Sequence, residues 1–237
     1  MRLSTEDQWC HDSVCSSYNS NTMTTKYMEM DVHNKKRISE VVKLCERNSQ
    51  NFYNGVYIHL YQSLPPWVNS IKKSNTKDYA AYVGYVHGAK IARVQFETHC
   101  ILTLVGTKVV GFLLYHVQRN AAKPMLEILY FIVDKDHRRK KHGSNMLQAI
   151  LRSYMIDAKK LEEGDVAENC ADLKVGKEYG RVSCITASMH RNASMPANFA
   201  FYTKNGFKNI EDIPEFGGYQ DDPEHFLSMG WVASPVS

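Results

Sequence analysis

Apolar positions in the first third of the chain predict a polar leader followed by helical structure. Residues 1–35 are polar and lack a periodic apolar pattern, so we expect a flexible N-terminal tail. A helix is predicted next from apolar residues at three- and four-residue steps: Ile38, Val41, Val42, Leu44 and Cys45. Ser39 is a candidate cap for this helix. Phe52–Trp67 is rich in aromatic residues, and Asp78–Lys90 fits either a helix or a strand.

From residue 92 onward the pattern becomes strand-like. The predicted strands are Val94–Val105, Val109–Gln118, Leu126–Val133, Val182–Met189 and His225–Val232. The first two are joined by a short Gly-containing turn, which predicts an antiparallel hairpin. Leu126–Val133 is almost continuously apolar, which is typical of a central strand in a sheet.

Two further helices alternate with these strands. Gly143 opens a strongly amphipathic helix, and Pro196–Asn205 reads as a helix that stops at Gly206. Residues 161–180 are acidic and aperiodic, and we interpret them as an insertion within one domain that spans residues 36–237. This order of elements predicts a mixed α/β (α+β) fold, in which helices flank one twisted, mostly antiparallel sheet.

Composition narrows the function classes. The 237 residues are 43% hydrophobic, and the longest apolar runs are far shorter than the ~18 residues that a membrane span needs. The net charge of 29 − 25 = +4 is too small for a dedicated nucleic-acid binder. We therefore expect neither a membrane nor a nucleic acid as a partner.

Cysteine spacing indicates free thiols. The six cysteines contain no CxxC pair, and no second pair completes a zinc site with Cys10 and Cys15. We expect no bound metal. No secretory signal is visible, so an intracellular location, cytoplasmic or nuclear, is the default expectation.

The most informative segment joins the Leu126–Val133 strand to the helix at Gly143. It holds four consecutive cations, Arg138–Lys141, with His137 and His142 on either side. Free N–H groups and the positive end of the dipole make a helix N-terminus a site for anions. Four cations at such a terminus favour a pyrophosphate site over a solvated basic face. No Walker A or GxGxxG motif is present.

This segment resembles motif A of the GNAT N-acetyltransferase superfamily, in which a strand runs into an [RQ]-x-x-G-x-[GA] loop. Arg138 takes the first position and Gly143 the last. Lys141 stands where the middle glycine usually lies. A lysine there implies a strained positive φ, weaker cofactor binding, or an added contact to a phosphate.

Two other segments carry the same resemblance. Val109–Phe112 resembles the family's hairpin strand before motif A, and Phe201–Phe207 closely resembles its F-Y-x-x-x-G-F motif B. The resemblance covers about residues 92–232, and it implies the GNAT fold with acetyl-CoA as co-substrate. It implies that acetyl-CoA is bound by the following residues: Phe131, Ile132, Val133, Arg138, Arg139, Lys140, Lys141, His142, Gly143 and Ser144.

The resemblance also implies catalytic residues for acetyl transfer to a primary amine. A lysine-like amine is neutral in only about one molecule in 2,500 at pH 7, so a general base helps. Glu127 lies 16 residues before Gly143, the offset of the catalytic glutamate in the histone-acetylating branch. Tyr202 matches the tyrosine that protonates the departing thiolate. The alternatives are a structural glutamate and a core tyrosine. Transfer is direct, and Cys184 is expected to pack rather than react.

The acceptor amine is open at this stage. Six carboxylates follow motif B: Glu211, Asp212, Glu215, Asp221, Asp222 and Glu224. They favour a cationic acceptor, such as a protein lysine, an N-terminus or a polyamine, although a solvated acidic loop explains them equally. A small-molecule acceptor such as an aminoglycoside or amino sugar is an alternative, with Phe52–Trp67 as a pocket wall. Another is a non-catalytic GNAT-fold module that binds a partner through Arg138–Lys141.

Overall fold

A single seven-stranded sheet organises the molecule. The computed structural model describes residues 24–48, 50–68, 75–118, 124–154, 182–192, 195–216 and 223–232. The strands are β1 (Thr25–Glu29), β2 (Glu97–Val105), β3 (Lys108–Gln118), β4 (Met125–Val133), β5 (Cys184–His190), β6 (Lys208–Asn209) and β7 (Phe226–Val232). Their order across the sheet is β1-β2-β3-β4-β5-β7-β6, and only the β4–β5 pair is parallel. The predicted mixed, mostly antiparallel sheet is confirmed.

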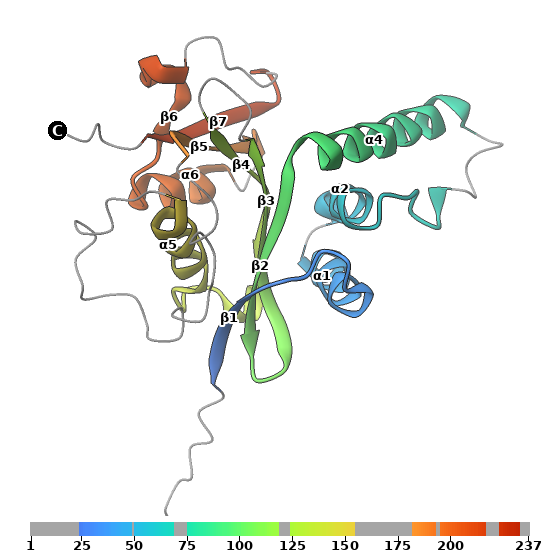
Figure 1. Cartoon of the computed structure of the whole chain (residues 1–237), viewed down its shortest axis with the longest axis horizontal. Helices are drawn as coiled ribbons and strands as arrows, with labels where there is room; N and C mark the ends of the chain where they lie inside the picture. Colours follow the sequence, from blue (N-terminus) through green and yellow to red (C-terminus); the bar gives the residue numbers. More distant parts are fainter. Residues whose placement is uncertain are drawn as a thin grey trace, which may run out of the picture.

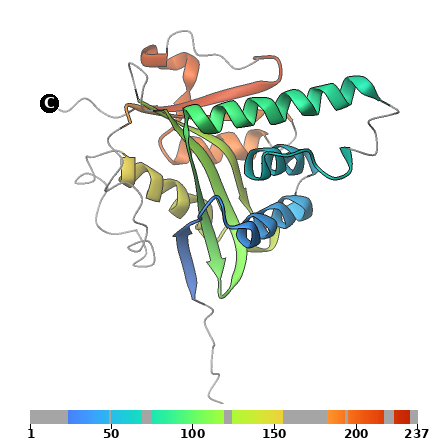
Figure 2. The same cartoon turned by 45° about the vertical axis from the view of Figure 1, so that its right-hand side comes forward.

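Helices cover both faces of this sheet (Figure 1). The α-helices are α1 (Lys35–Asn48), α2 (Gln50–Tyr61), α4 (Thr76–Gln95), α5 (His142–Tyr154) and α6 (Met195–Lys204). Helices α1, α2 and α4 lie on one face, whereas α5 and α6 lie on the other, and the turned view in Figure 2 shows the same division. Short 3-10 helices follow β4 (η1, Lys135–His137) and β6 (η4, Ile210–Asp212; η5, Pro214–Phe216).

Each face of the sheet buries its own apolar core. On the α5 face, Leu113, Leu126 and Ile185 pack against helix residues such as Met146 and Ile150. A separate cluster fills the α1–α2 face, and its largest strand contributors are Leu102, Phe112 and Leu114. Strand alternation sends successive side chains to opposite faces, so the near-continuous apolar runs of β2, β3 and β4 serve both cores.

The N-terminal expectation is wrong for residues 24–35. Thr25–Glu29 form β1, which pairs antiparallel with β2 along the edge of the sheet, and α1 already begins at Lys35. The helix is capped by Asn34, whose side-chain oxygen accepts from the backbone N–H of Arg37, and not by Ser39. A five-residue strand with one fully buried side chain leaves too little periodicity to detect. Residues 1–23 lie outside the described residues.

The segment Asp78–Lys90, whose sequence fits either a helix or a strand, lies within helix α4. The helix runs to Gln95, so β2 starts at Glu97, three residues after the predicted start at Val94. Most of this helix is exposed to solvent, which explains why its sequence shows no clear apolar stripe. The predicted acidic insertion at residues 161–180 lies outside the described residues, as do Cys10, Cys15 and Cys170.

Candidate active site

The parallel strands β4 and β5 separate halfway along β4. They pair over Met125–Ile128 and Cys184–Ala187, and the ladder ends there. On its other side β4 stays paired with β3 through Val133. Among the described strands, the backbone of Leu129–Val133 therefore has a partner on the β3 side only. Its other edge offers hydrogen-bonding groups to a ligand with an extended, amide-containing chain.

A β-bulge sits where the strands part. The β3–β4 register passes from Leu114–Tyr130 to Tyr115–Ile128, so Leu129 is the extra residue. The bulge shifts the alternation of side chains along β4. Before it, Glu127 points to the face that carries α2, opposite Leu126 and Ile128. After it, Phe131 and Val133 join the α5 core, whereas Ile132 belongs to the α1–α2 core.

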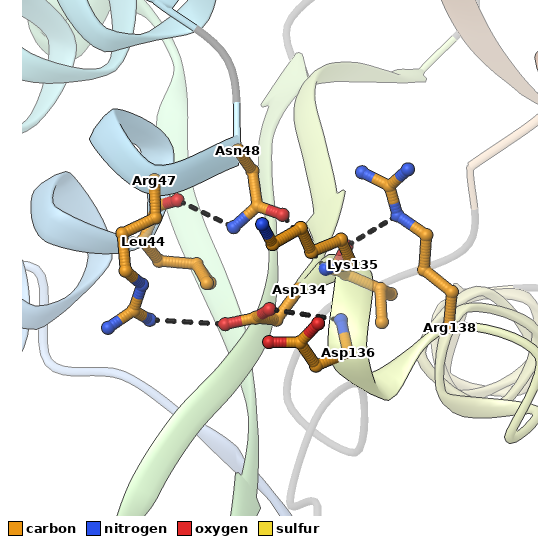
Figure 3. A network of polar contacts seen from close by, with 8 residues as sticks. Leu44, Arg47, Asn48, Asp134, Lys135, Asp136 and Arg138 are labelled. Atoms are coloured by element: carbon orange, nitrogen blue, oxygen red, sulfur yellow. Dashed lines mark hydrogen bonds and ion pairs between the residues drawn. The ribbon is translucent and has the colours of Figure 1, made fainter.

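The loop after β4 is fastened to α1 (Figure 3). Asp134 is only 4% exposed, and its carboxylate accepts from the backbone N–H of Asp136 at 3.2 Å, which caps η1. Its other oxygen lies 3.2 Å from Nη2 of Arg47. Asn48 adds a second link, because its side-chain oxygen accepts from the backbone N–H of Lys135 at 2.9 Å. The last turn of α1 thus fixes where β4 ends.

The four predicted cations follow η1 at the surface. Arg138, Arg139, Lys140 and Lys141 are all exposed, and Nε of Arg138 donates to the carbonyl of Val133 at 3.1 Å. Arg139 and Lys141 have φ values of 59° and 61°, in the left-handed region. Lys141 therefore keeps the backbone conformation for which a glycine is usual, and the strained positive φ among the three predicted options is present.

The start of α5 faces this basic loop. The first intrahelical bond runs from the N–H of Asn145 to the carbonyl of Lys141, so the N–H groups of His142, Gly143 and Ser144 precede it. Gly143 packs closely, since a Cβ atom there would lie 3.3 Å from the ring of Phe201. In the described part of the chain, four exposed cationic residues directly precede a helix end whose first N–H groups come before the first intrahelical bond, which suits a pyrophosphate.

Tyr27 of β1 contacts the same N-terminal turn of α5. Its hydroxyl lies 3.1 Å from Nδ1 of His142 and accepts from the side-chain amide of Asn145 at 2.9 Å. The pKa of His142 is lowered by burial, and further by His137 and Lys140 nearby. His142 is therefore neutral at pH 7 and serves to position the loop rather than to add charge.

Glu127 lies near the point where the strands part. It is half-buried, and in the sheet register it stands beside His116 of β3 and Thr186 of β5. His59 of α2 has its ring 5.7 Å from the rings of His116 and Tyr130. Tyr130 packs so closely on α2 that a Cβ atom at Gly55 would lie 2.8 Å from its Cζ.

Tyr202 sits on α6, on the opposite face of the sheet. It is 7% exposed and packs against the rings of Phe201 and Phe207. Burial raises the pKa of its hydroxyl, which stays protonated at neutral pH. Phe201 contacts Phe131 of β4 across the same space, with ring centroids 5.5 Å apart. Through Phe201, helix α6 therefore borders the β4 segment that has no second partner among the described strands.

The acidic segment after motif B is exposed but anchored. Glu211, Asp212, Glu215 and Glu224 are exposed, whereas Asp221 and Asp222 lie outside the described residues. Between the acids, η4 and η5 bury three apolar side chains, Ile210, Ile213 and Phe216. These pack with Cys184 of β5, on the sheet face that also carries Glu127.

Several residues of this site escaped detection in the sequence. Tyr27 lies within the expected tail, and Arg47, Asn48 and Asp134 carry no recognisable motif. The one available signal was Asp134 followed by Asp136 directly after an apolar strand, a pattern typical of a capped turn. The sequence identifies His116 only as one residue of the predicted strand Val109–Gln118.

Sequence comparison supports the class of protein that this fold and site indicate. Residues 59–167 match the Acetyltransferase (GNAT) family, which confirms the resemblance based on motif A. Motif B lies beyond the matched range. No curated protein matches the chain significantly.

Solved structures of low sequence identity align with the chain. An acetyltransferase of the GNAT family from Staphylococcus aureus aligns at 12% identity with a TM-score of 0.49, covering 89% of this chain and 100% of its own. The PaiA N-acetyltransferase of Thermoplasma acidophilum, in complex with coenzyme A, aligns at 15% identity and 0.45, covering 89% and 98%. The ribosomal-protein-S18-alanine N-acetyltransferase of Escherichia coli aligns at 9% and 0.46, covering 90% and 97%.

Two further features hold for the described ranges only. No helix there is both long and apolar enough to cross a membrane. Within the same ranges, no cluster of three or more His, Cys, Asp or Glu side chains is arranged to hold a metal ion.

Proposed function

We propose that the protein is an acetyl-CoA-dependent N-acetyltransferase that transfers an acetyl group directly to a primary amine. One observation carries the proposal: β4 loses its β5 partner after Ile128 and then ends in a basic loop at the start of α5. An extended amide chain fits the open edge of Leu129–Val133, and a pyrophosphate fits the loop. Coenzyme A joins these two chemical groups in one molecule.

The binding roles follow from this placement. The backbone of Phe131, Ile132 and Val133 would pair with the pantetheine arm. The N–H groups of His142, Gly143 and Ser144, with the cations Arg138–Lys141, would hold the pyrophosphate. The acyl carbonyl would then lie where β4 and β5 part, within reach of a backbone N–H of the bulged strand.

Two side chains would carry the proton transfers. Glu127 takes a proton from the acceptor ammonium, which leaves a neutral amine to attack the thioester. Tyr202 lies on the other side of the parted strands and donates to the departing sulfur. Because burial raises the pKa of Tyr202, its hydroxyl acts mainly through a hydrogen bond that stabilises the developing thiolate.

A cationic acceptor is supported by the acidic segment. The apolar side of η4–η5 packs beside β5, so its exposed carboxylates stand next to the face of the sheet that carries Glu127. Carboxylates around the entrance of a site attract cations and raise their local concentration. A protein lysine, a free N-terminus or a polyamine fits this field, and a neutral sugar gains nothing from it.

Calorimetry and turnover test the proposal together. We expect acetyl-CoA to bind the wild-type protein and to be consumed with at least one amine of a panel containing lysine peptides, spermidine and an aminoglycoside. Glu127→Gln should keep acetyl-CoA affinity and lose about 100-fold or more in kcat. Absence of acetyl-CoA binding, together with nucleic-acid binding through Arg138–Lys141, would instead indicate a non-catalytic binding module.

A further inference from the structure

One row of polar side chains crosses the sheet at the level of Glu127. The register places Thr98 beside His116, His116 beside Glu127, and Glu127 beside Thr186. Paired residues of adjacent strands point to the same face of a sheet, so the four side chains are neighbours. The contact of His116 with the ring of His59 places this row on the face of the sheet that carries α2.

Burial makes this row unusual. His116 is 5% exposed and Thr186 is fully buried. The Oγ1 atom of Thr186 has no hydrogen-bond partner in the described part of the chain. Leaving a buried hydroxyl unpaired costs about 1–3 kcal/mol, so the fold retains an unfavourable group beside Glu127.

Aromatic rings enclose the row at both ends. At one end, the rings of His59 and Phe96 each lie 5.7 Å from the ring of His116. At the other end, Thr186 pairs with Gly230, where a Cβ atom would lie 2.8 Å from the ring of Phe216. Aromatic side chains therefore border the row on both sides of Glu127, and aromatic rings near a carboxylate add cation–π attraction to its attraction by charge for an ammonium group.

We propose that His116, Glu127 and Thr186 together form the subsite for the acceptor's primary ammonium group. This inference rests on the proposed acetyltransferase function and identifies the residues at which its acceptor binds. The Glu127 carboxylate accepts a hydrogen bond from the ammonium, and the buried Thr186 hydroxyl beside it holds that carboxylate in place, which orients the ammonium nitrogen toward the point where β4 and β5 part. His116 acts as the proton acceptor behind Glu127.

The protons balance over one turnover. The ammonium gives one proton to the Glu127 carboxylate, which passes it to the imidazole of His116, leaving R–NH2 and an imidazolium. The amine lone pair forms the C–N bond, and the C–S bond breaks with its electron pair on sulfur. The second proton lost from the nitrogen ends on the sulfur, which leaves as the coenzyme A thiol beside the Tyr202 hydroxyl. The imidazolium then releases its proton to solvent.

Thr186 has a matched control on the same sheet. Thr103 of β2 is also fully buried with an unpartnered Oγ1, but it faces the α5 core. We expect Thr186→Val to raise the KM for spermidine or N-α-acetyl-lysine methylamide about tenfold, with unchanged acetyl-CoA affinity. Thr186→Ser keeps the hydroxyl and should have the KM of the wild-type protein. Thr103→Val should also leave the wild-type KM unchanged. Equal kinetics for the two valine variants would overturn the role of Thr186.

The proton-accepting role of His116 is tested by measuring how the activity of a His116→Gln variant depends on pH. Among the described residues, the titratable groups His59 of α2 and Glu127 of β4 face His116. His116→Gln should lower kcat about 30-fold at pH 7, and the deficit should shrink toward pH 9.5, where more of the acceptor is already neutral. A deficit that is equal at both pH values would overturn the proton-accepting role. A wild-type protein that binds no acetyl-CoA would instead overturn the proposed function itself.

Discussion

Arg47 and Asp134 connect the end of α1 with the end of β4, with Nη2 and Oδ2 3.2 Å apart across 87 positions of sequence. Asp134 is nearly buried and also caps η1, whereas the Arg47 side chain is about half exposed. Removing the Asp134 side chain should therefore cost more folding stability than removing that of Arg47. The loop that we assign to the pyrophosphate depends more on Asp134.

Asp134→Ala should lower the free energy of unfolding by about 1–2 kcal/mol, because a cap and an ion pair are lost together. Arg47→Ala should cost less than about 1 kcal/mol, as half-exposed pairs do. Urea denaturation of both single variants and the double variant measures the coupling. Equal costs for the two single changes would contradict this assignment. Asp134→Ala should also weaken acetyl-CoA binding.

Tyr27→Phe should weaken acetyl-CoA binding severalfold and destabilise the fold by about 1–2 kcal/mol. The change removes one hydroxyl that serves both His142 and Asn145 at the start of α5. Tyr115→Phe is the matched control, since Tyr115 belongs to the same core but its hydroxyl meets Tyr154 instead. Calorimetric titration with acetyl-CoA should separate them: only Tyr27→Phe changes the affinity.

Lys141→Gly should stabilise the protein by about 1 kcal/mol, because glycine adopts a positive φ without the steric cost of a Cβ atom. Its acetyl-CoA affinity should nevertheless fall at low salt, since one cation is lost beside the pyrophosphate. Arg139→Gly shares the positive φ and should show the same gain in melting temperature. Lys140→Ala should lose affinity without that gain. A Lys141→Gly variant that binds acetyl-CoA more tightly would contradict a phosphate contact.

Neutralising Glu211, Asp212 and Glu215 to Gln, Asn and Gln should raise the KM for spermidine severalfold at low ionic strength. The effect should fade as salt is added, because these carboxylates are exposed and act through a screened field. Glu46→Gln removes an exposed acid on α1, away from η4–η5, and should leave the KM unchanged. An unchanged KM in the triple variant would contradict a cationic acceptor.

Acidification should destabilise the fold. Burial lowers the pKa of both His59 and His142 in the folded protein. The unfolded chain therefore binds more protons once the pH falls below about 6.5, and stability is lost from there downward. Urea denaturation at pH 7.5 and pH 5.5 measures the loss. A His59→Gln/His142→Gln variant should lose less between these pH values than the wild-type protein does.

The sequence was sufficient for features that repeat or cluster. Leu126–Val133 and the amphipathic helix after Gly143 have strong apolar periodicity, and the structure has β4 and α5 there. The four cations stood out because they are contiguous. From these local signals the family and the general fold could be predicted, together with the loop where the cofactor is proposed to bind.

Long-range relationships could not be predicted. Tyr27 reaches α5 across more than a hundred positions, and β1 depends on its pairing with β2. The proposed roles of His116 and Thr186 depend on the register of the paired strands. They could not be predicted, because an isolated polar residue in an apolar strand has no sequence signal of its own. The bulge at Leu129, which places Phe131 on the opposite face of the sheet from Glu127, is likewise a property of paired strands.

The open edge of Leu129–Val133 also has a consequence for handling the protein. This stretch, Leu-Tyr-Phe-Ile-Val, is apolar, uncharged and strongly β-forming, and one side of its backbone lacks a strand partner among the described residues. Such an edge is a template for pairing with another polypeptide chain. A ligand that occupies it would act as a protective cover, so preparations without coenzyme A should aggregate sooner on storage than preparations that contain it.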